Sequence, residues 1–267
     1  MMQNITLGQY LPGDSSIHRL DPRNKTLLTL AYIIGVFLVK GFVGYALTAA
    51  LVYVCARMAR IPPRYLARGL KPLRVIILFT AIYNLFMSGG EDVMFQVWFI
   101  RATWSGLSGA VFYSLRLVFL VLGTSLLTLT TSPIALTDAL ERLLSPLRAV
   151  KFPAHELAMM MTIALRMIPT LLEETDKIMK AQSARGADFE SGNLLRRAKA
   201  MVPLLVPLFV SAFRRAGDLA MAMEARCYHG GEGRTRMRVM RLTAADLIAA
   251  GVMTAYIALI VLEGILL

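Results

Sequence analysis

Two arginines, each between small residues, are the side chains of this sequence best suited to bind a charged partner. They occur in Ala184-Arg185-Gly186 and in Ala225-Arg226-Cys227. A guanidinium flanked by small side chains is an unhindered fork that can donate two hydrogen bonds to one carboxylate. The sequence therefore predicts two docking points for acidic groups on other proteins.

No other group of side chains indicates catalysis or metal binding. His155-Glu156 begins like the zinc motif H-E-x-x-H, but position 159 is a methionine where the second histidine would stand. The sequence contains no G-x-x-x-x-G-K-[ST], so we expect the chain itself to bind no ATP. Cys55 and Cys227 lack the spacing of a metal or redox site, and no structural disulfide is expected. The chain is predicted to be non-catalytic and to bind no cofactor.

The composition indicates a membrane protein. Of the 267 residues 57% are hydrophobic, yet the formal net charge is +12, which soluble domains rarely combine. Residues 1–26 are polar without a signal-peptide pattern, so the first span is expected to be retained. Residues 89–104 are expected to form a loop with an interfacial segment. The apolar runs predict an all-α polytopic membrane protein with about five transmembrane helices, at residues 27–39, 41–56, 73–88, 105–130 and 244–266.

The positions of lysine and arginine predict how these spans are oriented. The loop after the second span is basic throughout and has no acidic residue, whereas the loop after the third contains Glu91, Asp92 and only Arg101. Basic loops stay in the cytoplasm, so we expect the N-terminus inside and the C-terminus outside the cell membrane. The basic excess is then a topology signal, and nucleic acid is not an expected partner.

Residues 131–243 are too many for a connecting loop and too charged for the bilayer, so they predict a cytoplasmic domain of long amphipathic helices. Apolar residues recur at helical spacing over 157–179 and over 204–223, with charged residues on the other side. Each helix would be about 45–50 Å long and end at one of the two arginines, with Gly186 suited to the C′ position. Pro203 and Pro207 are interpreted as the start of the second helix or a kink. The expected domains are 1–130, 131–243 and 244–267.

Two features leave alternatives open. The apolar stripes of these helices fit packing on each other, on the spans or on a partner, and their many methionines fit either gap filling or a surface that accommodates several partners. Arg116 lies in the middle of the fourth span, where a bare charge is costly, so it should face the bundle interior, water or a partner. A structural and a functional role are both open for Arg116.

The N-terminal sequence contains two distinctive stretches, Gly8-Gln9-Tyr10-Leu11-Pro12 and His18-Arg19-Leu20-Asp21-Pro22-Arg23-Asn24-Lys25. They resemble the N-terminal signature of the transmembrane T component of energy-coupling factor transporters. Residues 127–133, Leu-Thr-Leu-Thr-Thr-Ser-Pro, are similar to the segment where that family leaves its fourth span. The two small-Arg-small stretches correspond to the family's coupling motifs, although Cys227 is larger than the usual alanine, serine or glycine. Asp21, Pro22, Arg23 and Lys25 are candidate structural or functional residues of the signature.

The resemblance implies a transporter of four subunits. Two related ABC-type ATPases in the cytoplasm would bind ATP and magnesium, and each would receive one of Arg185 and Arg226. An exchangeable membrane S component would capture a vitamin or metal ion and rest on the methionine-rich helices. The N-terminal signature looks more like that of a module shared among several S components than like the dedicated cobalt or nickel type.

Two other functions compete with this interpretation. A conventional ABC importer permease would carry its own substrate path and a single coupling helix, and the duplicated arginine motif argues against it. A membrane enzyme or assembly factor would need polar residues converging within the membrane, where Arg116 is one of few candidates.

Overall fold

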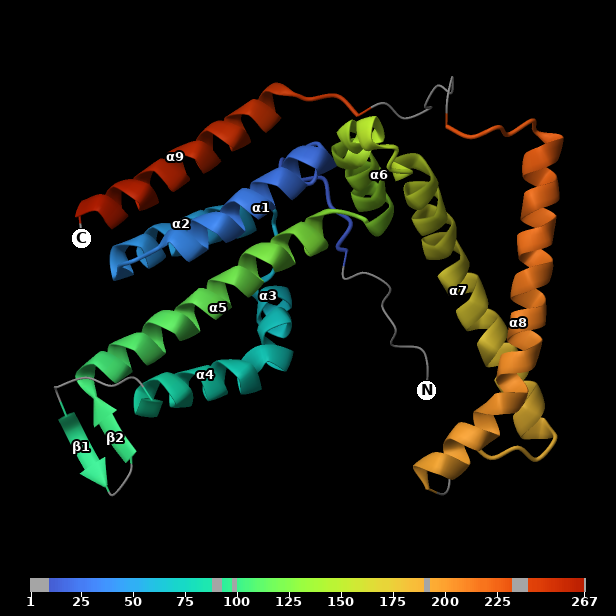
Figure 1. Ribbon diagram of the computed structural model, residues 1–267, viewed down its shortest axis with the longest axis horizontal. Helices are drawn as coiled ribbons and strands as arrows, with labels where there is room; N and C mark the ends of the chain where they lie inside the picture. Colours follow the sequence, from blue (N-terminus) through green and yellow to red (C-terminus); the bar gives the residue numbers. More distant parts are fainter. Residues whose placement is uncertain (1–9, 88–92, 98–99, 190–192, 232–239, 267) are drawn as a thin grey trace. The chain divides into compact units, whose positions relative to one another are not determined.

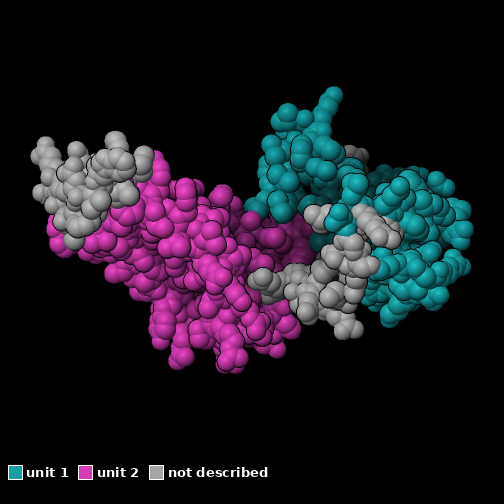
Figure 2. Space-filling view, turned by 90° about the horizontal axis from the view of Figure 1, so that it is seen from below, with its two compact units in different colours: residues 1–6, 140–237 teal, residues 7–139, 238–267 magenta. Residues whose placement is uncertain are grey.

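The computed structural model describes residues 10–87, 93–97, 100–189, 193–231 and 240–266. The chain forms two compact units (Figure 2). The first, here called the membrane unit, comprises residues 7–139 and 238–267. The second, here called the helical-pair unit, is built from residues 140–237 together with 1–6.

The membrane unit is helical apart from one hairpin in the described residues (Figure 1). Helices occupy all five runs predicted to span the bilayer, and those over residues 63–86, 104–130 and 244–266 are long and apolar enough to do so by themselves. The predicted all-α membrane fold is therefore confirmed. Its elements are α1 (Pro22–Leu38), α2 (Phe42–Met58), α3 (Pro63–Leu70), a 3₁₀ turn η1 (Lys71–Leu73), α4 (Arg74–Met87), β1 (Val93–Val97), β2 (Ile100–Thr103), α5 (Trp104–Thr130) and α9 (Ala244–Leu266).

Two boundaries differ from the sequence-based prediction. Helix α1 begins at Pro22 instead of residue 27, because Asp21 caps its N-terminus by accepting a hydrogen bond from the Arg23 amide and Pro22 occupies the first turn. Within the segment expected to be a loop, β1 and β2 pair as an antiparallel hairpin with a register irregularity between Val93 and Phe95. Val93, Phe95 and Val97 alternate along β1, and such residues favour strands.

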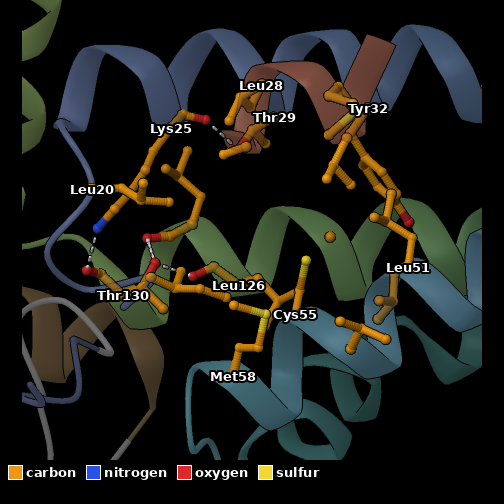
Figure 3. A pocket seen from close by; sticks show the side chains of 18 of the residues that line it. Leu20, Lys25, Leu28, Thr29, Tyr32, Leu51, Cys55, Met58, Leu126 and Thr130 are labelled. Atoms are coloured by element: carbon orange, nitrogen blue, oxygen red, sulfur yellow. Dashed lines mark hydrogen bonds between the residues drawn. The ribbon is translucent and has the colours of Figure 1, made fainter. Parts of the chain in front are cut away.

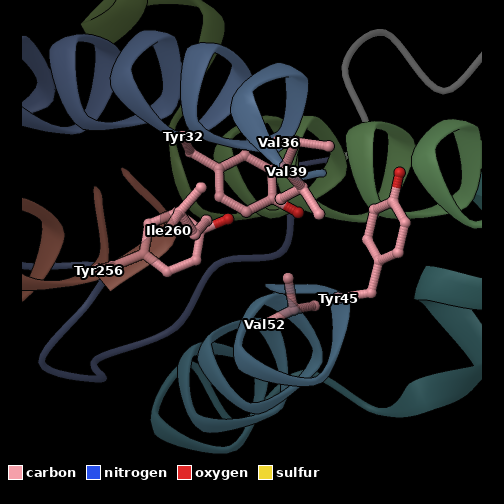
Figure 4. Close-up of a cluster of buried hydrophobic side chains, with 7 residues drawn as sticks. All are labelled: Tyr32, Val36, Val39, Tyr45, Val52, Tyr256 and Ile260. Atoms are coloured by element: carbon pink, nitrogen blue, oxygen red, sulfur yellow. The ribbon is translucent and has the colours of Figure 1, made fainter. Parts of the chain in front are cut away.

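The core of the membrane unit lies between α1, α2 and α9 (Figure 4). The Tyr32 hydroxyl donates to the Phe119 carbonyl of α5 at 2.7 Å, and a Cβ atom at Gly123 would overlap the Tyr32 ring. Thr48 and Tyr256 share a buried hydrogen bond of 2.9 Å between α2 and α9. Buried polar groups in the membrane must be paired, so these bonds determine how the four helices meet. The cluster consists of Tyr32, Val36, Val39, Tyr45, Val52, Tyr256 and Ile260.

The helical-pair unit is dominated by two long helices, α7 (Ala154–Ala184) and α8 (Leu194–Ala225). They follow α6 (Pro133–Leu144), which begins in the membrane unit, and a 3₁₀ turn η2 (Ser145–Val150). Both long helices were predicted, but α8 begins ten residues before the predicted stripe. Pro203 and Pro207 therefore lie inside α8 and do not start it, just as Pro169 lies inside α7.

Candidate functional site

The two predicted docking arginines occupy the same position at the ends of two helices. Arg185 is the C-cap of α7, with φ −88° and ψ 7°, and Arg226 is the C-cap of α8, with φ −96° and ψ 13°. Both side chains are exposed. A cation at a helix C-terminus is also favoured by the helix dipole.

The backbone around each arginine forms a Schellman motif. At the end of α7 the Gly186 amide donates to Ser183 and the Ala187 amide donates to Gln182, both at 3.0 Å. At the end of α8 the Cys227 amide donates to Glu224 at 2.9 Å, and the Tyr228 amide to Met223 at 3.0 Å. These are the C′-to-C2 and C″-to-C3 bonds of one capping geometry. Each guanidinium therefore leaves its helix from an equivalent backbone.

The residue after each arginine has a positive φ angle. Gly186 has φ 90°, and the prediction that it serves as the C′ residue is confirmed. Cys227 has φ 53° at the same position of the second motif. A left-handed conformation costs a residue with a Cβ atom about 1 kcal/mol or more, whereas glycine adopts it freely. The side chain of Cys227 is exposed, so the cost of a cysteine at this position comes from its backbone conformation and not from side-chain packing.

We expect opposite effects on helix-end stability when the C′ glycine of α7 is replaced by alanine and the C′ cysteine of α8 by glycine. Gly186→Ala should destabilise the end of α7 and Cys227→Gly should stabilise the end of α8, each by about 1 kcal/mol. Hydrogen exchange of the Ala187 and Tyr228 amides checks this, with exchange about fivefold faster in the first variant and about fivefold slower in the second. Unchanged exchange in both variants would mean that these caps do not limit local opening.

Helices α7 and α8 run antiparallel, so their arginines lie at opposite ends of the pair. The Arg215 guanidinium contacts the Glu174 carboxylate at 3.0 Å, while the start of α7 contacts the residues just after α8. Arg185 lies 11 residues beyond Glu174 and Arg226 lies 11 residues beyond Arg215, so at about 1.5 Å per residue the two ends are about 33 Å apart along the pair. One partner could not cover both arginines by a local contact.

A polar cluster joins the two helices near their middle. Arg215 also donates through Nε to the Ser211 hydroxyl at 3.4 Å. The pKa of Glu174 lies below its ordinary value, because Ser211 donates a hydrogen bond to its carboxylate and Arg215 adds a favourable charge. The carboxylate thus stays ionised beside its arginine at neutral pH.

The Arg226 end is connected to the start of α7 by His155. This histidine lies in the first turn of α7, with Nδ1 2.9 Å from the Glu141 carboxylate of α6 and Nε2 3.3 Å from the Tyr228 hydroxyl. A Cβ atom at Gly231 would overlap the histidine ring, so the chain after α8 passes directly over it. Tyr228 is the C″ residue of the second motif. This connection could not be predicted from the sequence, because its members lie far apart in the chain.

The N-terminal signature residues form the junction of α1, α5 and α9. Lys25 is buried, and its ammonium group donates to the carbonyls of His18 and Thr130, both at 3.1 Å. The Arg23 guanidinium donates to the Met240 carbonyl at 3.3 Å. The signature residues named from the sequence therefore hold the helix ends of the membrane unit together.

Asp246, which was not predicted from the sequence, is the centre of this junction. It is 1% exposed and lies in the first turn of α9. Its carboxylate accepts hydrogen bonds from the Asp21 amide at 2.9 Å and from the Thr243 amide and hydroxyl, each at 2.8 Å. The available signal was the spacing of Thr243 and Asp246, which resembles a capping box ahead of an apolar run.

Arg116 faces the bundle interior, one of the surroundings predicted for it. Its guanidinium donates to the Val39 carbonyl at 2.9 Å and lies over the rings of Phe37, Phe112 and Tyr113. Val39 is the C-cap of α1, so Arg116 places a cation at the negative end of that helix. Glu263 has the converse position, since it accepts from the Gly44 amide in the first turn of α2 at 2.8 Å. These contacts orient the turn between α1 and α2.

A cavity of about 380 Å³ lies between α1, α2, α5 and α9 (Figure 3). Its walls are apolar, with Tyr32, Leu51 and Leu126 around it and Lys25 at one end. The Lys25 ammonium points away to the Thr130 carbonyl, as the dashed line in Figure 3 marks. The described lining contains no carboxylate, and its chemistry is that of a hydrophobic packing space.

Comparison with known proteins decides the family. The profile of the CbiQ family, described as cobalt transport protein, matches residues 13–237. The chain belongs to the EcfT/CbiQ family. It is 59% identical over 248 residues to the energy-coupling factor transporter transmembrane protein EcfT of Thermosediminibacter oceani, with 93% of each chain covered. The EcfT of Clostridium kluyveri is 56% identical, with 94% of this chain and 93% of the relative covered. The EcfT of Bacillus subtilis is 51% identical, with 92% of this chain and 93% of the relative covered.

Membership of the EcfT/CbiQ family makes this chain a transmembrane component of a transporter. The profile match includes the Asp21 to Lys25 signature and both arginine ends. The apolar helices and the family agree on a membrane location. The resemblance seen in the sequence is thus confirmed at the level of the family.

Proposed function

We propose that this chain is the scaffold and coupling subunit of an energy-coupling factor transporter. It passes the motion of two ATPases in the cytoplasm to an S component that binds a vitamin or metal ion for uptake. The ATPases bind ATP and magnesium and carry out hydrolysis, and this subunit contributes mechanical links. The observation that carries the proposal is the repeated arginine cap at opposite ends of α7 and α8.

Two equal docking ends suit a pair of related ATPases. Arg185 and Arg226 leave their helices from equivalent Schellman backbones, so similar grooves with an acidic group could receive both. The antiparallel arrangement directs the two ends to different partners. When the two ATPases approach or separate, they displace the two ends of the helix pair relative to each other.

The apolar surface of the helix pair supports a membrane partner such as the S component. Large apolar side chains are exposed along it, and Phe209 and Phe213 are 61% and 74% exposed. Exposed apolar side chains in such number are unfavourable in water and mark an interaction surface. Its members on α8 are Met201, Val202, Leu205, Val206, Phe209, Val210, Phe213 and Met221, and on α7 they include Met160 and Met161.

Co-purification tests this assignment directly. The tagged chain, extracted gently from its native membrane, should bring two ATP-binding proteins and at least one small membrane protein with it. A conventional importer permease would instead bring a soluble substrate-binding protein and one kind of ATPase. Isolation of the chain with no ATPase under conditions that keep other transporters intact would contradict the proposal.

We expect the N-terminus and the helical pair on the cytoplasmic side and the C-terminus outside. After Cys55 and Cys227 are replaced by serine, a cysteine at Gly90 or after Leu267 should react with an impermeant thiol reagent on intact cells. A cysteine at Gly192 should react only after the membrane is opened. Positions 90, 192 and 267 lie outside the described residues, so the expectation rests on the loop charges. Labelling at position 192 in intact cells would refute this orientation.

A further inference from the structure

The connection between α2 and α4 is an exposed surface of a single charge. Over residues 57–74 there is no acidic residue. Every basic side chain of the segment is exposed. This basic surface consists of Arg57, Arg60, Arg64, Arg68, Lys71 and Arg74.

Packing of α3 on α5 directs these cations outward. Leu66 is buried in a cluster with Leu129 of α5, and a Cβ atom at Gly69 would lie 2.8 Å from the Ser125 hydroxyl oxygen. This close approach fixes which side of α3 faces the bundle. Arg64 and Arg68 are one helical turn apart and exposed, so they share the opposite side.

The surroundings of the basic surface are apolar and exposed. Met58 precedes it with 52% exposure, and Val75 and Ile76 follow it with 67% and 52%. The Arg68 guanidinium lies 5.2 Å from the centre of the half-buried Tyr65 ring. Tyrosine and arginine side chains of this kind are typical of the level where lipid headgroups meet the hydrocarbon.

The backbone at Arg60 adds a further observation. Arg60 has φ 55° and is the C′ residue of α2, with its amide donating to Arg57 and the Ile61 amide donating to Ala56. Glycine adopts this left-handed conformation without strain, whereas an arginine at the same position is strained. Unfavoured backbone at a charged residue points to a function of its side chain.

We infer that this basic surface binds the phosphate headgroups of anionic phospholipids. The single sign of charge complements them, and guanidinium groups bind phosphate oxygens bidentately. Continuity with the lipid-facing sides of α2 and α4 favours a lipid over a protein partner. Through Leu66 and Leu129, the bound headgroups fix the depth of α3 and of the end of α5, from which α6 continues.

The test measures which lipids the full-length chain retains. The chain is purified in mild detergent from membranes containing phosphatidylglycerol and phosphatidylcholine, and the bound lipids are quantified by mass spectrometry. The parent should retain phosphatidylglycerol selectively. Combined Arg60→Gln, Arg64→Gln and Arg68→Gln should weaken that selectivity by about fivefold for each cation removed. A control with Arg166→Gln, Lys177→Gln and Lys180→Gln changes three exposed cations of α7 and should leave it unchanged.

Salt provides a second measurement that needs no variant. Selective retention by the parent should fall as ionic strength rises, because exposed charges are screened over about 10 Å at 0.1 M salt. Equal retention of both lipids by the parent would overturn the inference. So would a triple variant that keeps its phosphatidylglycerol but loses bound ATPases, since that result assigns the surface to a protein partner.

Discussion

Replacing both Arg185 and Arg226 by alanine should abolish uptake while the protein still inserts into the membrane. Each guanidinium is expected to make a charge-assisted contact in a groove partly shielded from water. Loss of one such contact should cost about 2–5 kcal/mol of interface free energy, part of which is the unpaired charge left on the partner. Because the two ends are far apart, the costs should add. Pull-down of the ATPases and uptake in cells measure the two effects.

The single variants should be intermediate and show which end matters more. Arg185→Lys and Arg226→Lys should rescue only partly, because lysine keeps the charge but loses the planar fork. Arg214→Ala is the matched control, since Arg214 is exposed on α8 away from its end. A double alanine variant that expresses normally, retains its ATPases and transports at the parental rate would refute the coupling role.

Asp246→Ala should be the most destabilising single change in the membrane unit. The carboxylate is buried, and its removal leaves the amides of Asp21 and Thr243 without their acceptor. Each orphaned buried donor costs about 1–3 kcal/mol, so we expect a loss of about 3–5 kcal/mol. Thermal unfolding of the purified protein in detergent should show a lower midpoint. Asn24 also loses a hydrogen-bond partner, since its amide donates to Asp246 at 3.4 Å.

Two variants separate this effect from a general loss of charge. Asp246→Asn keeps the shape and one acceptor oxygen, so its destabilisation should be about half as large. Asp14→Ala removes an exposed carboxylate from the segment before α1 and should change the midpoint little. A midpoint for Asp246→Ala equal to that of Asp14→Ala would show that the junction does not limit stability.

The side-chain contacts of His155 are a feature of the Arg226 end and distinguish it from the Arg185 end. Tyr228 lies two residues after Arg226 and contacts the histidine, which in turn contacts Glu141 of α6. Helix α6 begins soon after the long apolar helix α5 ends. The Arg226 end is therefore connected to α6 by side-chain contacts in addition to the covalent chain.

Much of the fold could be predicted because its signals are local. Runs of apolar residues indicate spans, helical spacing indicates the long amphipathic pair, and a glycine after Arg185 indicates the end of a helix. The basic residues between α2 and α4 were visible for the same reason. The hairpin of β1 and β2 was not predicted, because a short apolar segment in a loop fits a strand as well as a segment lying at the membrane interface.

The sequence by itself determined the membrane class, the long helices and the two arginine motifs, since each depends on residues close together in the chain. Only the tertiary structure decided that Arg185 and Arg226 lie at opposite ends of an antiparallel pair on equivalent backbones. It also brought Asp246 to Asp21, and His155 to Tyr228. Such contacts join residues far apart in sequence, and which of them form depends on how whole helices pack.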